Sequence, residues 1–327
     1  MIDADDRLDK RLLLHYLEFL AALDAYETSG STRRSLNIST IRKMVVPLPP
    51  KNEQRRIAEA VEEELSRLAA AQSALTTASQ RAETLRLASL HDTLTEDEDS
   101  PRRRIADLLE VNIGGVWGEA PSKGELGARV FRITEFRPDG LIDPSTAALR
   151  SVTRRQLQRR ELRPHDLLLE KSGGGPNQLV GRVGMVPEHT GPAVCGNFVQ
   201  QMRCDRSAIV PRYLFWVMAL LFETGFVARF QTASTNIRNL KTRDYLQTEI
   251  PVPSIQMQEE AAAHLDMNAE QILRLRSELR KATVRSKTLE VAILREAFAG
   301  RLVAHEPSAR GSIKDSPGDN RVDGTSR

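Results

Sequence analysis

An internal repeat places the strongest constraint on the fold of this 327-residue chain. Residues 47–94 align without a gap with residues 251–298, which lie 204 positions further along. Each copy opens with prolines, which hold the backbone extended, and continues as an Ala-rich segment with helical spacing of its apolar residues. Such a repeat indicates one structural unit used twice. The aligned identities include Pro47 with Pro251, Pro49 with Pro253, Gln54 with Gln258, Leu75 with Leu279, Thr84 with Thr288, Leu85 with Leu289 and Leu90 with Leu294.

Both copies carry apolar residues at heptad spacing, with the same register. An isolated helix cannot bury such a stripe in water, whereas two of them can bury it against each other, and alanines let the backbones approach closely. We therefore expect the two helices to pair as a coiled coil. The alternative is two separate helices, each packed on its own globular domain. The residues expected to pair the helices are Val61, Leu68, Leu75, Leu85, Leu265, Ile272, Leu279 and Leu289, with Ala71, Ala78, Leu275 and Ala282 at the second heptad position.

Between the repeats the sequence changes to short elements. RVFRITEF, DLLLEKSG, LVGRVGMV and GNFVQQMRC predict strands, and TRRQLQRREL and RYLFWVMALLFETGFVARF predict helices. Near the N-terminus we expect a helix over 1–28 and a short strand, MVVPLP, before the first prolines. The expected organisation is a remnant of a first domain (1–50), a long helix (51–94), an acidic linker (95–100), a complete α/β domain (101–250), a second long helix (251–303) and a disordered tail (304–327).

The repeat also predicts that the first half of the chain is shortened. Residues 1–46 match only the end of the later domain, from its final helix through SGST (29–32), the counterpart of TAST (232–235). We therefore expect an N-terminal truncation. Whether it is natural or reflects an incompletely assigned gene stays open at this point.

Charge and composition restrict the function classes. The formal net charge is +3, but residues 101–250 carry 22 Lys/Arg against 15 Asp/Glu, which suits a polyanionic partner. A solvated Arg-rich surface is the alternative. Cys195 and Cys204 make neither a metal-site spacing nor a disulfide framework. No signal peptide and no membrane-length apolar run is evident, so we expect a cytoplasmic protein without a membrane partner.

Polar and basic side chains in the 101–250 domain are candidates for DNA contact. One group lies on the predicted TRRQLQRREL helix, another surrounds the Ser172-Gly173-Gly174-Gly175 loop, and a third follows TAST. Arg and Lys suit phosphates and guanine, whereas Asn and Gln suit adenine. For any one of them, a solvated or intramolecular role is the alternative. The candidates are Arg154, Arg155, Arg159, Arg160, Lys171, Asn177, Gln178, Arg182, Asn236, Arg238 and Lys241.

The motifs of catalysis are missing from the sequence. The Gly173–Gly175 run is not followed by the Gly-Lys-Ser/Thr of a phosphate-binding loop. Glu170 and Lys171 suggest a nuclease, but neighbours on a strand point to opposite faces. There is no HExxH spacing among the six histidines, no Asn-Pro-Pro-aromatic methyltransferase motif and no glycine-rich cofactor fingerprint. We expect no catalytic residues, cofactor or metal, and therefore a chain that is not an enzyme by itself.

The chain resembles the specificity subunit of type I restriction–modification systems. The resemblance covers about residues 7–303 and rests on the two long helices and on three sequence segments. It implies an α+β fold in which a target-recognition domain is flanked by two long helices that pair as an antiparallel coiled coil. It also implies sequence-specific recognition of double-stranded DNA and a scaffold for methyltransferase (M) and restriction (R) subunits. The segments are GST…NIS…PLPPKNEQRRIA (30–58), TAST…IPVPSIQMQEEAA (232–262) and DLLLEKSGGG (166–175).

Two departures from the family pattern leave alternatives open. Most of a first recognition domain is missing, and Met257 replaces the counterpart of Glu53. The chain could homodimerise and recognise a symmetric site, or it could be a silent cassette without DNA specificity. A coiled-coil module whose central domain binds protein is the hypothesis from another class. Candidate positions for docking partner subunits on the helices are Glu62, Glu63, Arg274 and Arg276.

Overall fold

The computed structural model describes residues 7–23, 44–95, 99–122, 127–173, 175, 178–188, 191–234 and 237–302. The predictions for SGST, for residues 96–98 of the acidic linker, for Asn177, for Asn236 and for the 304–327 tail lie outside these residues. The chain forms two compact units, of which unit 1 comprises 1–75 and 282–327 and unit 2 comprises 76–281. Among the described helices, none is both long and apolar enough to cross a membrane.

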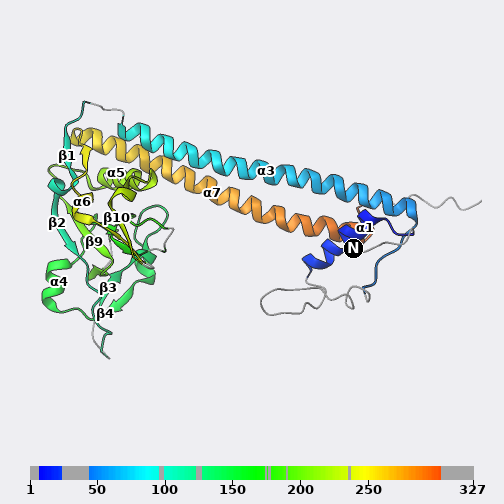
Figure 1. Cartoon of the computed structure of the whole chain (residues 1–327), viewed down its shortest axis with the longest axis horizontal. Helices are drawn as coiled ribbons and strands as arrows, with labels where there is room; N and C mark the ends of the chain where they lie inside the picture. Colours follow the sequence, from blue (N-terminus) through cyan, green and yellow to red (C-terminus); the bar gives the residue numbers. More distant parts are fainter. Residues whose placement is uncertain are drawn as a thin grey trace, which may run out of the picture. The chain divides into compact units, whose positions relative to one another are not determined.

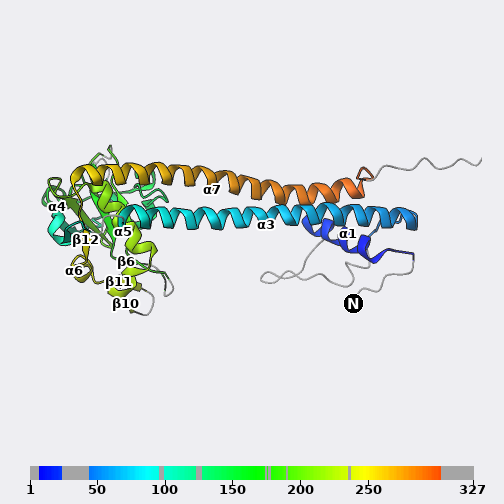
Figure 2. The ribbon, with the colours of Figure 1, turned by 90° about the horizontal axis from the view of Figure 1, so that it is seen from above.

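The two repeats form the long helices α3 (Lys51–Thr95) and α7 (Ile255–Phe298) (Figures 1 and 2). In unit 1 the start of α3 packs on the end of α7, and Ile57, Val61 and Leu294 share one buried cluster. In unit 2 the end of α3 packs on the start of α7, where Leu90 and Leu265 join the main core. In each unit the two helices therefore run antiparallel, which confirms the expected pairing.

The first heptad position of the coiled coil is buried or half-buried along both helices. At the second predicted position the prediction is wrong for the leucines, because Leu85, Leu275 and Leu289 are 66%, 44% and 51% exposed, whereas Ala78 and Ala282 are half-buried. At several turns the residues four places after the first position are buried or half-buried instead, whereas Ser79, Arg276, Thr283 and Glu290 at the same spacing are exposed. The buried or half-buried residues at this spacing include Leu65, Gln72 and Arg86 in α3 and Ala262, Ala269 and Ala297 in α7.

A charge cluster explains why Arg86 rather than Leu85 lies in the seam of unit 2. The Arg86 guanidinium is 2.7 Å from the Glu83 carboxylate and 3.0 Å from the Glu223 carboxylate, and Arg276 of α7 also pairs with Glu83. A half-buried arginine is tolerated when carboxylates satisfy its donors. Apolar spacing alone could not reveal these partners, because Glu223 is distant in sequence.

Unit 2 contains a mixed α/β domain built on a four-stranded antiparallel sheet in the order β2-β9-β5-β7. Three smaller sheets have the orders β4-β3-β8, β10-β11-β6 and β1-β12. The strands are β1 (Arg102–Arg104), β2 (Leu109–Gly114), β3 (Ala128–Phe131), β4 (Ala148–Arg150), β5 (Leu167–Glu170), β6 (Ser172–Gly173), β7 (Val183–Met185), β8 (Ala193–Cys195), β9 (Val199–Cys204), β10 (Gln231–Ser234), β11 (Ile237–Leu240) and β12 (Glu249–Pro251). The remaining helices of the unit are α4 (Arg154–Arg160), α5 (Pro211–Glu223), α6 (Thr242–Tyr245), and the 3-10 turns η1 (Ile105–Leu108), η2 (Ile133–Glu135), η3 (Pro144–Thr146) and η4 (Phe226–Phe230).

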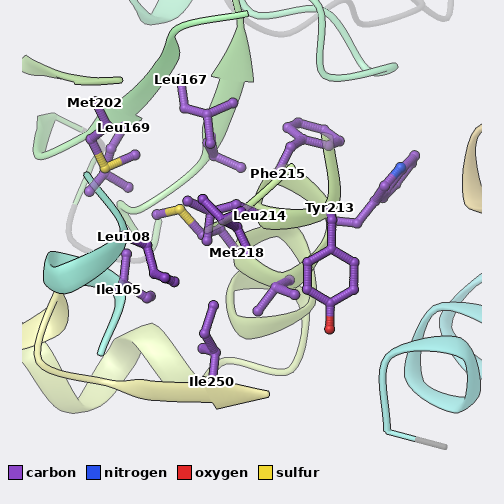
Figure 3. Close-up of a cluster of buried hydrophobic side chains, with 14 of the residues drawn as sticks. Ile105, Leu108, Leu167, Leu169, Met202, Tyr213, Leu214, Phe215, Met218 and Ile250 are labelled. Atoms are coloured by element: carbon purple, nitrogen blue, oxygen red, sulfur yellow. The ribbon is translucent and has the colours of Figure 1, made fainter. Parts of the chain in front are cut away.

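The apolar run of β5 is buried on both faces of the sheet. Leu167 and Leu169 belong to the main core with Leu214 of α5 (Figure 3). Leu168 points to the other face, where it joins a second cluster with Phe131. Alternation of side chains along a strand distributes the run between two cores. The predicted strand therefore positions the Glu170–Gly173 segment that follows it.

Helix α5 is shorter than the helix predicted over 212–230. It begins at Pro211, which suits a first helical turn, and buries every side chain from Tyr213 to Met218. The chain then turns at Gly225, whose φ of +73° is costly for residues with a Cβ atom, and continues as η4. The glycine inside the apolar run marks this helix end.

Two predictions near the N-terminus are also corrected. The helix expected over 1–28 is α1, Lys10–Ala22, and residues 24–28 lie outside the described part. The MVVPLP segment, 44–49, forms no strand. Its counterpart in unit 2, β12, pairs with β1, and within the described residues of unit 1 no strand offers such an edge. A strand without a neighbour cannot satisfy its backbone groups by a ladder.

In each unit, a buried glutamine near the start of the long helix forms the same hydrogen bonds with the segment that enters a short helix. We call this arrangement the joint. Gln54 accepts a hydrogen bond from the Asp9 amide (2.7 Å) and donates to the carbonyl of Pro49 (2.8 Å). Gln258 accepts from the Val210 amide (2.7 Å) and donates to the carbonyl of Pro253 (2.8 Å). Both glutamines are buried. Helix α1 therefore corresponds to α5, which has the same length of 13 residues.

An ion pair repeats beside each joint. Arg11 of α1 donates to Glu62 of α3 at 3.2 Å, and Arg212 of α5 donates to Asp266 of α7 at 2.6 Å. The two pairs occupy aligned positions of the repeat. The structural repeat therefore extends to the short helices, for which sequence identity gave only a weak signal.

Candidate nucleic-acid interface

Helix α4 presents most of the predicted arginine stripe to solvent. The helix begins with a capping box, in which Thr153 and Gln156 satisfy each other's backbone amides. Arg154, Arg155 and Arg159 are exposed. Arg160 is only half-exposed, because its Nε donates to the Gly114 carbonyl at 3.0 Å and ties α4 to the end of β2.

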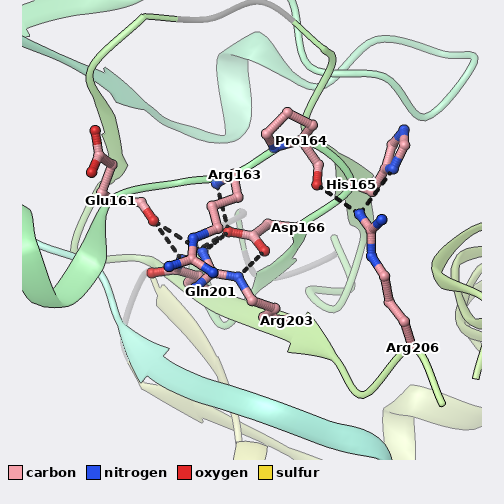
Figure 4. A network of polar contacts seen from close by, with 8 residues as sticks. All are labelled: Glu161, Arg163, Pro164, His165, Asp166, Gln201, Arg203 and Arg206. Carbon is pink, nitrogen blue, oxygen red and sulfur yellow. Dashed lines mark hydrogen bonds and ion pairs between the residues drawn. The ribbon is translucent and has the colours of Figure 1, made fainter. Parts of the chain in front are cut away.

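A buried carboxylate holds the C-terminal end of α4 (Figure 4). Asp166 is 1% exposed and accepts hydrogen bonds from Arg203 (2.7 and 2.8 Å) and from Gln201 (2.9 Å). The same two side chains of β9 donate to the carbonyl of Glu161, which caps α4, at 3.1 and 3.3 Å. Asp166, Gln201 and Arg203 therefore orient the arginine-bearing helix. No sequence pattern revealed them, because their pairing depends on strands brought together only in the fold.

The basic and polar residues around the β5–β6 turn converge with α4. Lys171 Nζ and Arg160 both approach Gly114, where an added Cβ would lie 3.0 Å from the lysine nitrogen. Arg238 lies opposite Gly173 in the β11–β6 pair. Leu240 donates to the Lys171 carbonyl at 2.8 Å, so Lys241 lies one residue from the same turn. We name this region, formed by Arg160, Lys171, Gln178, Arg238 and Lys241, the basic corner.

Arg182 has an intramolecular role instead. Its guanidinium donates to both carboxylate oxygens of Glu170, at 2.9 and 3.3 Å, and Glu170 is 1% exposed. The arginine therefore neutralises a buried charge. Glu170 faces inward while Lys171 is half-exposed. In the described part of the chain, no group of three His, Cys, Asp or Glu side chains is arranged to hold a metal ion.

A cavity of about 610 Å³ opens beside the basic corner. Its lining includes Trp117, Arg132 and Phe198, which no sequence motif singled out. The Arg150 and Arg132 guanidinium carbons lie 4.4 and 5.8 Å from the centre of the Trp117 ring, within the range of cation–π attraction. Trp117 is one of only two tryptophans in the chain, and this rarity was the available signal.

A second buried carboxylate supports one wall of this cavity. Glu135 accepts hydrogen bonds from the Arg132 amide (2.6 Å), from the Arg132 guanidinium (2.7 Å) and from the Thr134 hydroxyl (2.8 Å). Burial by itself would raise the pKa of Glu135, but these hydrogen bonds and the Arg132 charge lower the pKa overall. The carboxylate therefore stays ionised and fixes Arg132.

Neither cysteine thiol is suited to act as a nucleophile. Burial raises the pKa of the Cys195 thiol and of the Cys204 thiol to about 12. Both residues lie on strands of the α/β domain and are buried. They therefore act as small apolar side chains.

Comparison with known proteins identifies relatives of the chain. Residues 2–77 match the family described as the type I restriction modification DNA specificity domain. The chain is 25% identical over 330 residues to the type I restriction enzyme EcoBI specificity subunit of Escherichia coli, an alignment that covers 92% of this chain and 67% of the relative. The chain is therefore similar to type I specificity subunits over most of its length.

Solved structures show that this chain shares the fold of proteins from type I restriction–modification systems. One is a chain from a study of complex assembly and conformational transition of the type I restriction–modification system, with a TM-score of 0.71 and 20% identity over 92% of this chain and 74% of that chain. Another is the HsdS subunit of Thermoanaerobacter tengcongensis, with a TM-score of 0.51 and 20% identity over 89% and 70% of the two chains. The α+β architecture with paired long helices is thus a fold known from specificity subunits.

Proposed function

We propose that this chain is a type I specificity subunit and that it binds double-stranded DNA through the basic corner and the exposed face of α4. The observation that carries the proposal is that Arg160 of α4 and Lys171 both approach Gly114 and that Arg238 of β11 lies opposite Gly173, in a domain with excess positive charge. Phosphate contacts from arginine and lysine fix the position of a protein on DNA, and contacts with base edges determine which sequence it recognises.

The residues of this surface form two groups, one suited to phosphate contacts and the other to recognition of bases. Arg154, Arg155 and Arg159 are exposed on one short helix and suit successive phosphates. Gln178 is exposed at the end of the glycine-rich turn, and its amide can donate and accept at once, as recognition of an adenine edge requires. Arg182 is excluded from direct contact in this proposal, because Glu170 occupies it.

The long helices would supply the docking surface for methyltransferase and restriction subunits. The candidates Glu62, Glu63, Arg274 and Arg276 are already paired within the chain, with Arg11, Arg67, Glu270 and Glu83 respectively. The exposed leucines Leu85, Leu275 and Leu289 are better candidates, because exposed apolar side chains are available for an interface. In this role the subunit directs catalysis that its partners perform, and it would act in the cytoplasm.

A methylation map tests the proposal directly. The subunit would be expressed with its cognate methyltransferase subunit and the modified DNA sequenced for methylated sites. A split, symmetric motif would indicate DNA recognition by a homodimer, and unlike halves would indicate a second recognition domain. No methylation despite co-purification would identify a silent cassette. Failure to co-purify would contradict the scaffold role.

The salt dependence of DNA affinity tests the surface. We expect the double variant Arg154→Ala/Arg155→Ala to bind duplex DNA more weakly and to reduce the slope of log affinity against log salt by about 0.9 for each phosphate that the variant no longer binds. Arg274→Ala, an exposed arginine on α7, is the matched control and should leave the slope unchanged. Equal slopes for all three proteins would remove α4 from the interface.

A further inference from the structure

The cavity beside the basic corner has the size of a ligand site. Its volume of about 610 Å³ lies in the middle of the range found for small-molecule pockets. It is bounded by the segment after β2, by η2, by the β5–β6 turn and by the β8–β9 turn. The residues used below are Trp117, Arg132, Glu170, Gln178, Asn197 and Phe198.

The aromatic wall of the cavity is exposed yet held in place. Phe198 is 55% exposed, although its backbone is fixed. Its carbonyl accepts hydrogen bonds from the amides of Lys171 (2.9 Å) and Ser172 (3.3 Å), and Val199 closes the turn onto Gly196 at 2.9 Å. An exposed ring on a rigid turn is prepared for stacking, because little further ordering is needed when a ligand binds.

The approach of β2 to this turn adds to its rigidity. A Cβ on Gly115 would lie 2.2 Å from the carbonyl oxygen of Gly196, so the two segments are in contact through their backbones. Only glycine fits at this position. Trp117 follows two residues later, and its place in the wall is thereby tied to the turn that carries Phe198.

The polar groups of the cavity fall into two classes. The charged ones are compensated, since Glu170 is paired with Arg182 and Arg132 with Glu135. The amide side chains of Gln178 and Asn197 are exposed, and no described residue forms a hydrogen bond with either. Neutral amides beside aromatic rings match the edge and the faces of a heterocyclic base.

We propose that this cavity binds a single nucleobase that has left the base stack, with its faces against Trp117 and Phe198 and its edge toward Gln178 and Asn197. The proposal rests on the proposed function, because the basic corner would hold the strand that delivers the base. A base inside a duplex cannot enter a cavity, so the base must be unpaired or turned out of the helix. The same chemistry would accept the base of a free nucleotide.

Tryptophan fluorescence of the full chain provides the test. The chain has two tryptophans, and Trp216 is buried in the core with its Nε1 bonded to Asp266. Fluorescence quenching that the wild-type chain shows and the Trp117→Phe variant does not show therefore comes from Trp117 and reports binding in the cavity. The probes are four duplexes that each contain one unpaired base, the fully paired parent duplex, and free dAMP, dCMP, dGMP and TMP.

We expect at least one unpaired-base duplex to quench Trp117 and to bind roughly tenfold more tightly than the paired duplex, as base–aromatic stacking allows. Phe198→Ala should remove this preference while leaving affinity for the paired duplex nearly unchanged. Leu149→Ala is the matched control, because Leu149 is also 55% exposed in the same domain but does not line the cavity. It should keep the preference.

The outcomes separate this inference from the DNA-binding proposal. Tight binding of all duplexes without Trp117 quenching would overturn the inference and leave DNA recognition intact. Quenching by free nucleotides without DNA binding would support a nucleobase site and overturn the DNA-binding proposal. A Phe198→Ala variant that loses affinity equally for paired and unpaired duplexes would also overturn the inference, because Phe198 would then contact the duplex surface.

Discussion

At the scale of single residues, the most informative side chains are buried polar ones that bind backbone atoms. Gln54 and Gln258 are 1% and 0% exposed, and each satisfies the backbone at the start of a neighbouring helix. Asp166 holds Gln201 and Arg203, and these two side chains donate to the Glu161 carbonyl at the C-terminal end of α4. A buried polar group left without its partner is costly, so these residues fix the joints between elements.

Replacement of Gln258 by leucine should lower the free energy of unfolding by about 2 kcal/mol. The Val210 amide would lose its 2.7 Å acceptor while remaining near the core. Urea unfolding followed by circular dichroism measures the loss. Gln256→Leu, at an exposed position in the same helix, should change stability by less than about 0.5 kcal/mol. Equal effects of the two substitutions would contradict a special role for Gln258.

Glu135 gives stability a specific pH dependence. Its folded-state pKa is lowered below the ordinary value of 4.5, so its stabilising effect is complete above pH 4.5 and is lost as the pH falls through the folded pKa. We expect the free energy of unfolding of wild type to exceed that of Glu135→Gln by about 2 kcal/mol at pH 7, and the difference to shrink below pH 4.5. A constant difference between pH 7 and pH 3 would contradict this assignment.

At the scale of elements, the coiled coil shows how far the sequence could be interpreted. The period of 3.5 and one heptad position followed from apolar spacing alone, and Val61 and Leu265 lie where expected. The second position could not be predicted, because leucine stands at exposed positions and arginine at a half-buried one. The partners that decide this, Glu223 of α5 and Arg276 of α7, come from distant parts of the chain.

Leucine-to-alanine substitutions along the helices should distinguish the buried heptad position from the positions at which leucine is exposed. Leu265→Ala removes a 3%-exposed side chain from the core of unit 2 and should cost about 3 kcal/mol. Leu85→Ala and Leu289→Ala should each cost less than about 0.5 kcal/mol, because both side chains are exposed. Denaturant unfolding tests these values. A loss above about 1.5 kcal/mol at Leu85 would restore the original heptad assignment.

The candidate DNA surface could also be predicted only in part from the sequence. Arg154, Arg155 and Arg159 could be found from a run of like charges on one predicted helix, and α4 presents them as expected. The structural role of Arg182 could not be predicted, because Glu170 reaches it only through the β5–β7 pairing. Trp117 and Phe198 could not be recognised as site residues, since isolated aromatic residues carry no spacing signal.

At the scale of the whole molecule, two units repeat one joint but differ in what surrounds it. Among the described residues, unit 1 has a buried cluster of five side chains, whereas the main core of unit 2 extends from α3 through the sheet to α7. Leu14 of α1 is 54% exposed, and its counterpart Phe215 of α5 is 3% exposed against the Gly140 turn. The two joints therefore have the same hydrogen bonds, but the short helix beside the joint is more deeply buried in unit 2 than in unit 1.

Hydrogen exchange should reveal this difference between α1 and α5. The helices have the same length, but α5 buries six consecutive side chains and α1 buries only Leu12 and His15. We expect peptides from α1 to exchange deuterium faster than peptides from α5 by roughly tenfold or more, because local opening exposes less apolar area. Mass spectrometry of the full chain under native conditions measures both. Similar protection would show that α1 is covered by something further.

The joint itself has a consequence for which side chains the adjoining segments can carry. Gln54 and Gln258 contact only main-chain atoms of the segments that enter α1 and α5, namely the amides of Asp9 and Val210 and the carbonyls of Arg7 and Ala208. Every amino acid offers those atoms, apart from proline at the two amide positions. The glutamines therefore place almost no demand on the side chains of the segments that enter α1 and α5, and the demand for particular side chains comes from the neighbouring ion pairs Arg11–Glu62 and Arg212–Asp266.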